Sequence, residues 1–539
     1  MAVSETQYDA IIVGAGFSGL YMLHRLRQQG LSARIYEAGT GVGGTWYWNR
    51  YPGARVDIES QEYSYSFSPE LDAEWVWSER YATQPELLRY LNHVADRFDL
   101  RSDIQLETRV LSTVFDPGAT RWTATTNQGE VVSARYCVMA TGCLSVANEP
   151  NFPGVDSFQG KSWHTARWPR EGVDFTGQRV AVIGTGSSAI QSIPLIAAEA
   201  DHVTVFQRTP NFSVPAHNGP VAPEVVADWA ANRAERRREA RETGFAIRMV
   251  DPREEPALEA TPEARKAAYE ARWAVGGFAL LGAYGDLIMD TKANATAAEF
   301  VHEKIREIVK DPITAEKLSP RSFPIGSKRL CVDTGYYATF NRENVSLVDL
   351  REEAIEAITP RGVRTAAGDY AVDAIVYAIG FDAMTGALSK IDIRGRDNLA
   401  LTDAWAAGPR TYLGLMVAGF PNLFLVTGPG SPSVLANMAV AIEQHVDWIA
   451  DCIGHLGQHQ VGAIEATGAA QDAWVTHVNE IADTTVYPLA NSWYMGANVP
   501  GKPRVFMPYI GGFPAYQQTC NDVAAKGYEG FTLTADGRA

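Results

Sequence analysis

The sequence predicts an α/β fold with two Rossmann-type dinucleotide-binding units and a helical insertion in the second unit. Two glycine-rich turns, each directly after a short apolar strand, carry this prediction. The insertion is predicted from a stretch after the second turn that is rich in Ala, Glu and Arg, which are good helix formers.

Composition excludes several classes of protein. The 539 residues are 46% hydrophobic and 20% charged, which is ordinary for a globular chain with a large core. The net charge of -16 would repel a polyanion, so we expect no nucleic-acid partner. No apolar run approaches the roughly 20 residues that span a bilayer, so we expect no membrane partner. Nothing implies an obligate protein partner.

The five cysteines, at positions 137, 143, 331, 452 and 520, are scattered and form no CxxC pair. This pattern argues against a disulfide scaffold, a structural zinc site and a redox dithiol, and we expect no metal site. The N-terminal stretch lacks the basic region of a signal peptide and reads as a buried strand. With unpaired cysteines and no export signal, the expected location is cytoplasmic.

The first predicted unit begins with the strand 10–13 and continues into a glycine-rich turn, a helix and a second strand over 34–36. The glycines permit a tight turn and let a pyrophosphate approach the free N–H groups at the helix start. Glu37 ends the second strand, 23 residues after Gly14, near the spacing of an acid that binds ribose hydroxyls. The turn residues predicted to bind the cofactor are Gly14, Gly16, Ser18 and Gly19.

A second unit is predicted from the strand 179–183, a small-residue turn and the strand 203–206. Here the acid is replaced by Gln207-Arg208-Thr209, and an arginine accommodates the 2′-phosphate that an acid would repel. One glycine-rich turn is a weak signal of a dinucleotide site. Two such turns, each followed by a residue suited to its cofactor, Glu37 in the first unit and Arg208 in the second, are a strong signal. The natural pair of cofactors is FAD with NADPH/NADP+. The second turn comprises Gly184, Thr185, Gly186, Ser187, Ser188 and Ala189.

Helices are predicted over 227–242 and 262–273, and the run Arg236-Arg237-Arg238 is interpreted as a solvated helix face. Segments 136–142 and 371–380 resemble one another as return strands that end in glycine. The predicted domains are therefore an FAD-binding domain from 1–145 and 381–539, an NADP-binding domain from 146–215 and 326–380, and a helical insertion over 216–325.

Three further segments contain residues that indicate the type of flavin enzyme. Residues 43–57 are dense in Trp, Tyr and Pro, which suits a flat ligand such as isoalloxazine, and end at Asp57, whose alternative role is a turn-forming one. Residues 158–169 fit the pattern FxGxxxHxxxWP, and residues 491–502 read NSWYMGANVPGK. All three segments resemble the type I Baeyer–Villiger monooxygenases. The resemblance extends from Tyr8 to about Phe531 and is closest to the phenylacetone and steroid monooxygenase branch, through residues 324–350, 407–415 and 428–438.

This resemblance implies an enzyme that uses NADPH and O2 to convert a ketone to an ester or lactone through a C4a-peroxyflavin. It implies two catalytic residues, Arg329 beside the flavin and ketone, and Asp57 as its counter-charge. It places His164 in a structural role at the domain junction. The cofactor-binding residues that it implies, beyond those of the two turns, are Glu37, Thr45, Trp46, Asp57, Tyr63, Val110 and Met438 for FAD, and Gln191, Arg208, Thr209, Lys328, Arg329 and Trp493 for NADP.

Three alternatives are open to test. A related flavin monooxygenase could oxidise N or S atoms, although such enzymes usually end the 158–169 motif with an aromatic and a basic residue instead of Trp168-Pro169. A pyridine-nucleotide disulfide reductase needs a redox dithiol, which the cysteine spacing does not offer. A non-enzymatic redox sensor would not need the arginine and aromatic segments.

Overall fold

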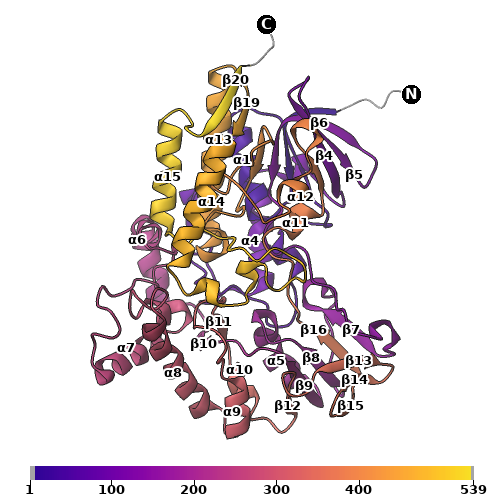
Figure 1. Cartoon of the computed structure of the whole chain (residues 1–539), viewed down its shortest axis with the longest axis vertical. Helices are drawn as coiled ribbons and strands as arrows, with labels where there is room; N and C mark the ends of the chain where they lie inside the picture. The colour runs from indigo at the N-terminus through magenta and orange to yellow at the C-terminus, as the bar shows by residue number, and fades with distance from the viewer. Residues whose placement is uncertain (1–5, 536–539) are drawn as a thin grey trace.

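The computed structural model describes residues 6–535, in which two sheets occupy opposite ends of an elongated molecule (Figure 1). The larger, eight-stranded sheet has the order β17-β4-β5-β6-β1-β2-β3, with β18 beside β6. Strands β1, β2 and β6 are parallel, and the Ala10–Val13 part of β1 is buried, as expected for a sheet with helices on both faces. The strands are β1 (Thr6–Val13), β2 (Ala33–Tyr36), β3 (Ile104–Gln105), β4 (Val110–Asp116), β5 (Arg121–Thr126), β6 (Val131–Met139), β17 (Asp392–Arg394) and β18 (Leu423–Leu425).

Helices from both ends of the chain cover this sheet. Helix α1 follows β1 and packs against α13, which lies more than 400 residues later in the sequence. The antiparallel strands β19 and β20, which α14 and α15 separate in the sequence, lie beside the C-terminal helices at the upper end of the molecule (Figure 1). The elements are α1 (Phe17–Gln28), α2 (Thr45–Trp48), α3 (Pro69–Glu74), α4 (Gln84–Arg97), α11 (Gly386–Ser389), α12 (Leu401–Ala404), α13 (Met438–Gln458), β19 (Val461–Ala466), α14 (Gly468–Asp483), α15 (Phe513–Ala525) and β20 (Phe531–Ala535).

The second sheet is entirely parallel, with the order β12-β9-β8-β16-β7. Helix α5 connects β8 to β9, so this unit repeats the strand–turn–helix–strand arrangement of the first. A three-stranded antiparallel sheet, β13-β14-β15, is appended to it. The elements are β7 (Lys161–His164), β8 (Arg179–Ile183), α5 (Ser187–Glu199), β9 (His202–Gln207), α10 (Tyr336–Thr339), β12 (Val345–Asp349), β13 (Ile355–Thr359), β14 (Gly362–Thr365), β15 (Gly368–Ala371) and β16 (Ala374–Tyr377).

A mainly helical segment interrupts the second unit. Strand β10 (Ser213–Pro215) enters it and pairs in parallel with β11 (Cys331–Asp333), which leaves it, so the segment begins and ends at one place. Helix α6 extends from this segment towards α15 of the first unit (Figure 1). The helices of the segment are α6 (Pro223–Glu242), α7 (Pro262–Val275), the 3₁₀ helix η4 (Gly277–Gly282), α8 (Thr291–Ile308) and α9 (Pro312–Leu318).

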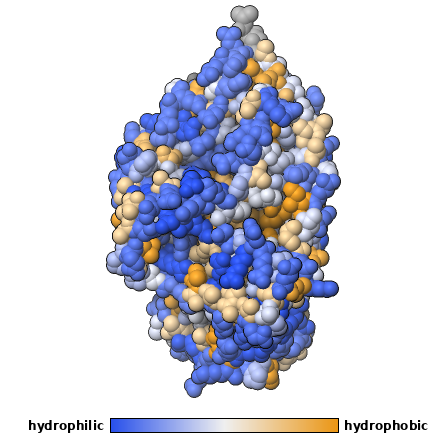
Figure 2. Space-filling model, turned by 90° about the vertical axis from the view of Figure 1, so that its left-hand side faces the viewer, coloured by the Kyte–Doolittle hydropathy of each residue, from blue (hydrophilic) through white to orange (hydrophobic). Residues whose placement is uncertain are grey.

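The face that carries α6 and α15 is mainly hydrophilic, with apolar side chains in small, separate patches (Figure 2). None of the helices within residues 6–535 is long and apolar enough to cross a membrane.

The predicted α/β fold with two Rossmann-type units is confirmed, although two details differ. The segment 371–380 is not one strand: Ala371 ends β15, and only Ala374–Tyr377 form β16. The run 236–238 is not a solvated face, because Arg237 is only 6% exposed. Its guanidinium pairs with the mostly buried Asp72 at 2.8 Å, so this side of α6 packs against residues of the first unit instead of facing the solvent. The predicted domain boundaries stay predictions.

Candidate active site

The first glycine-rich turn has the geometry of a phosphate cradle. Gly14 has φ +106°, and a Cβ there would lie 2.6 Å from the carbonyl oxygen of Ala140. A Cβ at Gly19 would lie 1.9 Å from the Gly14 oxygen, so helix α1 starts in direct contact with the turn. No described side chain caps α1 at Gly16, and Ser18 is buried in its first turn. The free N–H groups at this helix start fit a pyrophosphate.

Glu37 lies beside this turn and is 5% exposed. Its carboxylate accepts hydrogen bonds from the backbone N–H groups of Ala15, at 2.8 Å, and Gly39, at 2.7 Å. Burial raises the pKa of Glu37, and these two hydrogen bonds oppose the rise. The structure therefore shows that Glu37 stabilises the turn through these hydrogen bonds, while its contact with a ribose stays a prediction.

Aromatic side chains gather next to the start of α1. The ring of Tyr63 packs edge-on against Phe17, with centroids 5.3 Å apart, and its hydroxyl accepts a hydrogen bond from Trp46 Nε1 at 3.3 Å. Thr45 is exposed at the first position of α2. Burial raises the pKa of Tyr63, so its hydroxyl keeps its proton at neutral pH. These groups fit a flat, apolar ring.

The two remaining residues predicted for FAD, Val110 and Met438, begin β4 and α13. Val110 is buried at the start of β4, two residues after Thr108, whose N–H donates to the Glu37 carbonyl oxygen at 2.8 Å. Val110 is thus near the glutamate predicted to bind ribose. Met438 is the first residue of α13 and is half-buried.

The second glycine-rich turn repeats the cradle. Gly184 has φ +112°, and a Cβ there would lie 2.3 Å from the Ala378 oxygen. By contrast, no described heavy atom lies within 4 Å of a Cβ built on Gly186. Helix α5 starts at Ser187 without a side-chain cap from any described residue. Ser187 and Ser188 are half-buried in its first turn, whereas Ala189 packs into the core.

Gln191 contacts the first unit. Its Oε1 accepts a hydrogen bond from the Tyr51 hydroxyl at 2.9 Å, and its Nε2 donates to the Arg55 carbonyl at 3.1 Å. A Cβ at Gly53 would lie 2.4 Å from the Gln191 carbonyl oxygen. The Gln191 amide thus joins the two dinucleotide units, and its predicted contact with NADP stays a prediction.

Two cations lie together beyond the second turn. Burial and the nearby charge of Arg208 lower the pKa of Lys328. The Lys328 ammonium lies 4.4 Å from the centre of the Phe323 ring. Within residues 6–535, neither cation forms an ion pair with a carboxylate. Thr209 lies next to them, and its carbonyl accepts a hydrogen bond from Thr185 Oγ1 at 2.8 Å. Two neighbouring cations without a counter-charge fit an anion such as a 2′-phosphate.

Arg329 and Asp57, 272 residues apart in sequence, form a two-pronged ion pair. Arg329 Nε and Nη2 donate to the Asp57 carboxylate at 2.8 and 2.7 Å, and Nη1 donates to the Val434 carbonyl at 2.7 Å. The guanidinium carbon lies 4.6 Å from the centre of the Phe278 ring. Burial opposes the charge of Arg329, but attraction to Asp57 outweighs it and raises the pKa of Arg329. This arginine is therefore a permanent, oriented cation.

A cavity adjoins this pair and includes two tyrosines that the sequence did not indicate. Burial raises the pKa of Tyr494 to about 12, although Arg329 opposes the rise, so the hydroxyl stays protonated. The half-buried ring of Trp493 lies 4.2 Å from the Tyr494 ring. In the sequence, the indication of Tyr494 was its position directly after Trp493, a residue predicted to bind NADP. The cavity is lined by Phe245, Ile247, Val250, Phe278, Leu281, Gly326, Lys328, Arg329, Leu330, Leu435, Tyr487 and Tyr494.

All five cysteines are buried, and none is paired. No group of three or more His, Cys, Asp or Glu residues in the described part of the chain could hold a metal ion. His164 ends β7 and is 9% exposed, and its Nδ1 accepts a hydrogen bond from Ala166 N at 3.0 Å.

Known proteins share this architecture over the whole chain. Residues 11–243 match the family described as pyridine nucleotide-disulphide oxidoreductase. A Baeyer–Villiger monooxygenase from Pseudooceanicola batsensis is 42% identical over 525 residues, which are 97% of this chain and 95% of the relative. A phenazine N-monooxygenase from Lysobacter antibioticus is 42% identical over 536 residues, which are 99% of this chain and 98% of that one.

Among solved structures, an oxidized steroid monooxygenase bound to NADP is 54% identical with a TM-score of 0.94, covering 98% of this chain and 100% of its own. Because this similarity extends across both cradles and the Arg329 site, the chain belongs to the type I Baeyer–Villiger monooxygenases, which use FAD, NADPH and O2 to convert ketones to esters or lactones.

Proposed function

We propose that an apolar ketone binds next to Arg329, and that Arg329 is a catalytic residue that stabilises negative charge on the ketone oxygen. The two-pronged pair with Asp57 is the observation that carries this proposal, because it fixes the planar guanidinium at the cavity wall. Mostly apolar side chains line the remainder of the cavity. A fixed cation in such surroundings stabilises developing charge without having to reorient during the reaction.

The other predicted residues take binding roles in this proposal. When bound, FAD supplies hydride acceptance and oxygen activation. The first cradle and Glu37 bind its adenosine diphosphate half, and the aromatic group around Tyr63 contacts its ring. The second cradle binds the NADPH pyrophosphate, while Arg208 and Lys328 select its 2′-phosphate. Trp493 covers the nicotinamide and helps to exclude water. Asp57 orients Arg329, and the Tyr494 hydroxyl beside it stays protonated.

The Arg329→Ala variant tests this proposal. We expect FAD to bind and anaerobic flavin reduction by NADPH to continue, while ester or lactone formation falls about 10²–10³-fold, the cost typical of losing one such donor. The measurement is ester or lactone formed per NADPH consumed, across aryl, cyclic and steroid ketones. Arg364→Ala is the matched control, because Arg364 forms the same two-pronged pair with Asp369 at an exposed position. An Arg329→Ala enzyme that oxygenates ketones at the wild-type rate would refute the assignment.

Heteroatom oxidation is the second candidate function, favoured by the similarity to the phenazine N-monooxygenase. The substrate panel therefore includes a thioether and an aromatic N-heterocycle. Faster formation of the N- or S-oxide than of any ester would make heteroatom oxidation the main activity.

A further inference from the structure

We propose that Arg237 in α6 is a positioning residue for the flavin side of the active site, acting through the loop 62–67. This inference rests on the proposed placement of the flavin beside Tyr63 and Met438. The loop carries Tyr63 but belongs to no sheet, so its backbone needs partners from elsewhere. Some of those partners come from the helical insertion and others from α13, and both are distant from the loop in the sequence.

Arg237 holds this loop with both terminal nitrogens of its guanidinium. Nη1 donates to the carbonyl oxygens of Glu62 and Ser64 at 3.4 and 3.2 Å. Nη2 donates to Ser64 Oγ at 2.7 Å and to the Tyr65 carbonyl at 3.4 Å. The residues whose carbonyls it contacts lie on both sides of Tyr63, so Arg237 restrains the backbone on either side of that ring.

A carboxylate balances the buried charge of Arg237. Asp72 accepts hydrogen bonds from Nη2 at 2.8 Å and Nε at 3.2 Å, and the Trp229 ring lies 5.3 Å from the guanidinium carbon. A planar fork with five donors can satisfy several carbonyls and a carboxylate at once, whereas the single ammonium of a lysine cannot. The site therefore requires arginine and not only a positive charge.

The same loop is connected to the start of α13. The Glu62 carbonyl also accepts a hydrogen bond from Asn437 Nδ2 at 2.8 Å, and Asn437 Oδ1 caps α13 by accepting from Ala439 N at 3.1 Å. Met438 lies between Asn437 and Ala439. One carbonyl thus connects Arg237, the Tyr63 loop and the helix start that carries Met438.

A second contact holds the far end of the loop. Glu443 of α13 is 3% exposed and accepts hydrogen bonds from the backbone N–H groups of Ser66 and Phe67, at 2.5 and 2.9 Å. Arg241, one turn beyond Arg237, donates to Glu443 at 2.9 Å and to Ser66 Oγ at 2.8 Å. The loop is therefore held at its carbonyls by Arg237 and at its N–H groups by Glu443.

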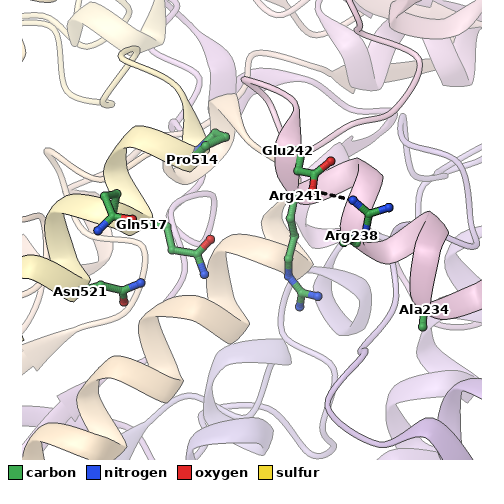
Figure 3. A pocket seen from close by; sticks show the side chains of 8 residues that line it. Ala234, Arg238, Arg241, Glu242, Pro514, Gln517 and Asn521 are labelled. Carbon is green, nitrogen blue, oxygen red and sulfur yellow. Dashed lines mark hydrogen bonds and ion pairs between the residues drawn. The ribbon is translucent and has the colours of Figure 1, made fainter.

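The neighbouring Arg238 points the other way and provides a control. It pairs with Glu242 (Figure 3), at 2.9 Å, and its side chain is 61% exposed. Both residues lie at a surface groove of about 430 Å³ between α6 and α15. Arg241 extends away from this pair (Figure 3).

The test compares Arg237→Lys, Arg237→Ala and the control Arg238→Ala in the full-length enzyme. The readouts are the melting temperature, the FAD dissociation constant from flavin fluorescence, the visible circular dichroism of the bound flavin, and separate kcat and KM values. For Arg237→Lys we expect a folded protein with FAD binding weakened about tenfold, or about 1.4 kcal/mol. We also expect an altered flavin dichroism and a lower kcat, with the KM for NADPH unchanged, because Arg208 and Lys328 belong to the other unit. Arg238→Ala should match the wild type.

A folded Arg237→Lys enzyme with wild-type FAD affinity, dichroism and kcat would overturn the proposal. So would an equal loss in Arg238→Ala, because that result would trace the effect to charge and not to the loop. If Arg237→Ala does not fold, Arg237→Lys alone decides. FAD affinity and dichroism do not depend on ketone turnover, so weakened FAD binding in an enzyme that oxidises no ketone would support Arg237 while refuting the proposed function.

Discussion

The two cations at the second cradle predict a specific pattern of coenzyme selection. Charge-assisted hydrogen bonds contribute about 1.5–3 kcal/mol each. Arg208 is exposed, so solvent screening places it at the lower end, and Arg208→Ala should raise the KM for NADPH about tenfold. Lys328 is half-buried and packs on Phe323, so Lys328→Ala should raise that KM by closer to a hundredfold. The KM for NADH, which lacks the 2′-phosphate, should change little in either variant.

The pH dependence gives a sharper form of the same prediction. Burial and repulsion from Arg208 lower the pKa of Lys328, so it loses its proton at a lower pH than an ordinary lysine. In the wild type, kcat/KM for NADPH should therefore fall as the pH rises through that lowered pKa. Arg208→Ala removes the repulsion and should move this alkaline fall to higher pH. The corresponding profile for NADH should lack the fall.

The assay is steady-state oxidation of each coenzyme with a ketone in excess, at constant ionic strength over a range of pH. Arg179→Ala is the control, since Arg179 lies at the opposite end of β8 and pairs with Asp373 at the surface. Equal losses with NADPH and NADH, or an alkaline fall that stays in place in Arg208→Ala, would refute this reasoning.

Two further predictions concern the cavity and the core. Trp493→Ala should weaken NADP+ binding and raise the hydrogen peroxide released per NADPH, because an indole covering the nicotinamide excludes water; an unchanged peroxide yield would contradict this role. Burial lowers the pKa of His445 to about 3, so the unfolded chain takes up a proton near pH 6.5 that the native state excludes. The free energy of unfolding should therefore fall as the pH drops from about 6.5, and His445→Gln should show a shallower fall in denaturant titrations; equal slopes would argue against it.

The sequence by itself determined both dinucleotide units. The reason is that a phosphate cradle is local: the strand, the glycines and the helix start lie within about 20 residues, and Gly14 and Gly184 adopt φ values that favour glycine. The absence of an acid next to Arg208 was likewise visible in the sequence, as was the lack of a cysteine pair. The resemblance supplied the family, which the similarity over the whole chain confirmed.

Only the tertiary structure decided which distant side chains meet. The resemblance implied Asp57 as the counter-charge of Arg329, but their positions, 272 residues apart in the sequence, do not reveal the 2.7 Å contact. The same holds for Gln191, whose amide joins the two units, and for Tyr494, which lies beside Arg329. The arginine run of α6 shows the physical reason most clearly. Adjacent identical residues have the same intrinsic preferences, and it is the partner surface packed against the helix that buries Arg237 and leaves Arg238 in solvent.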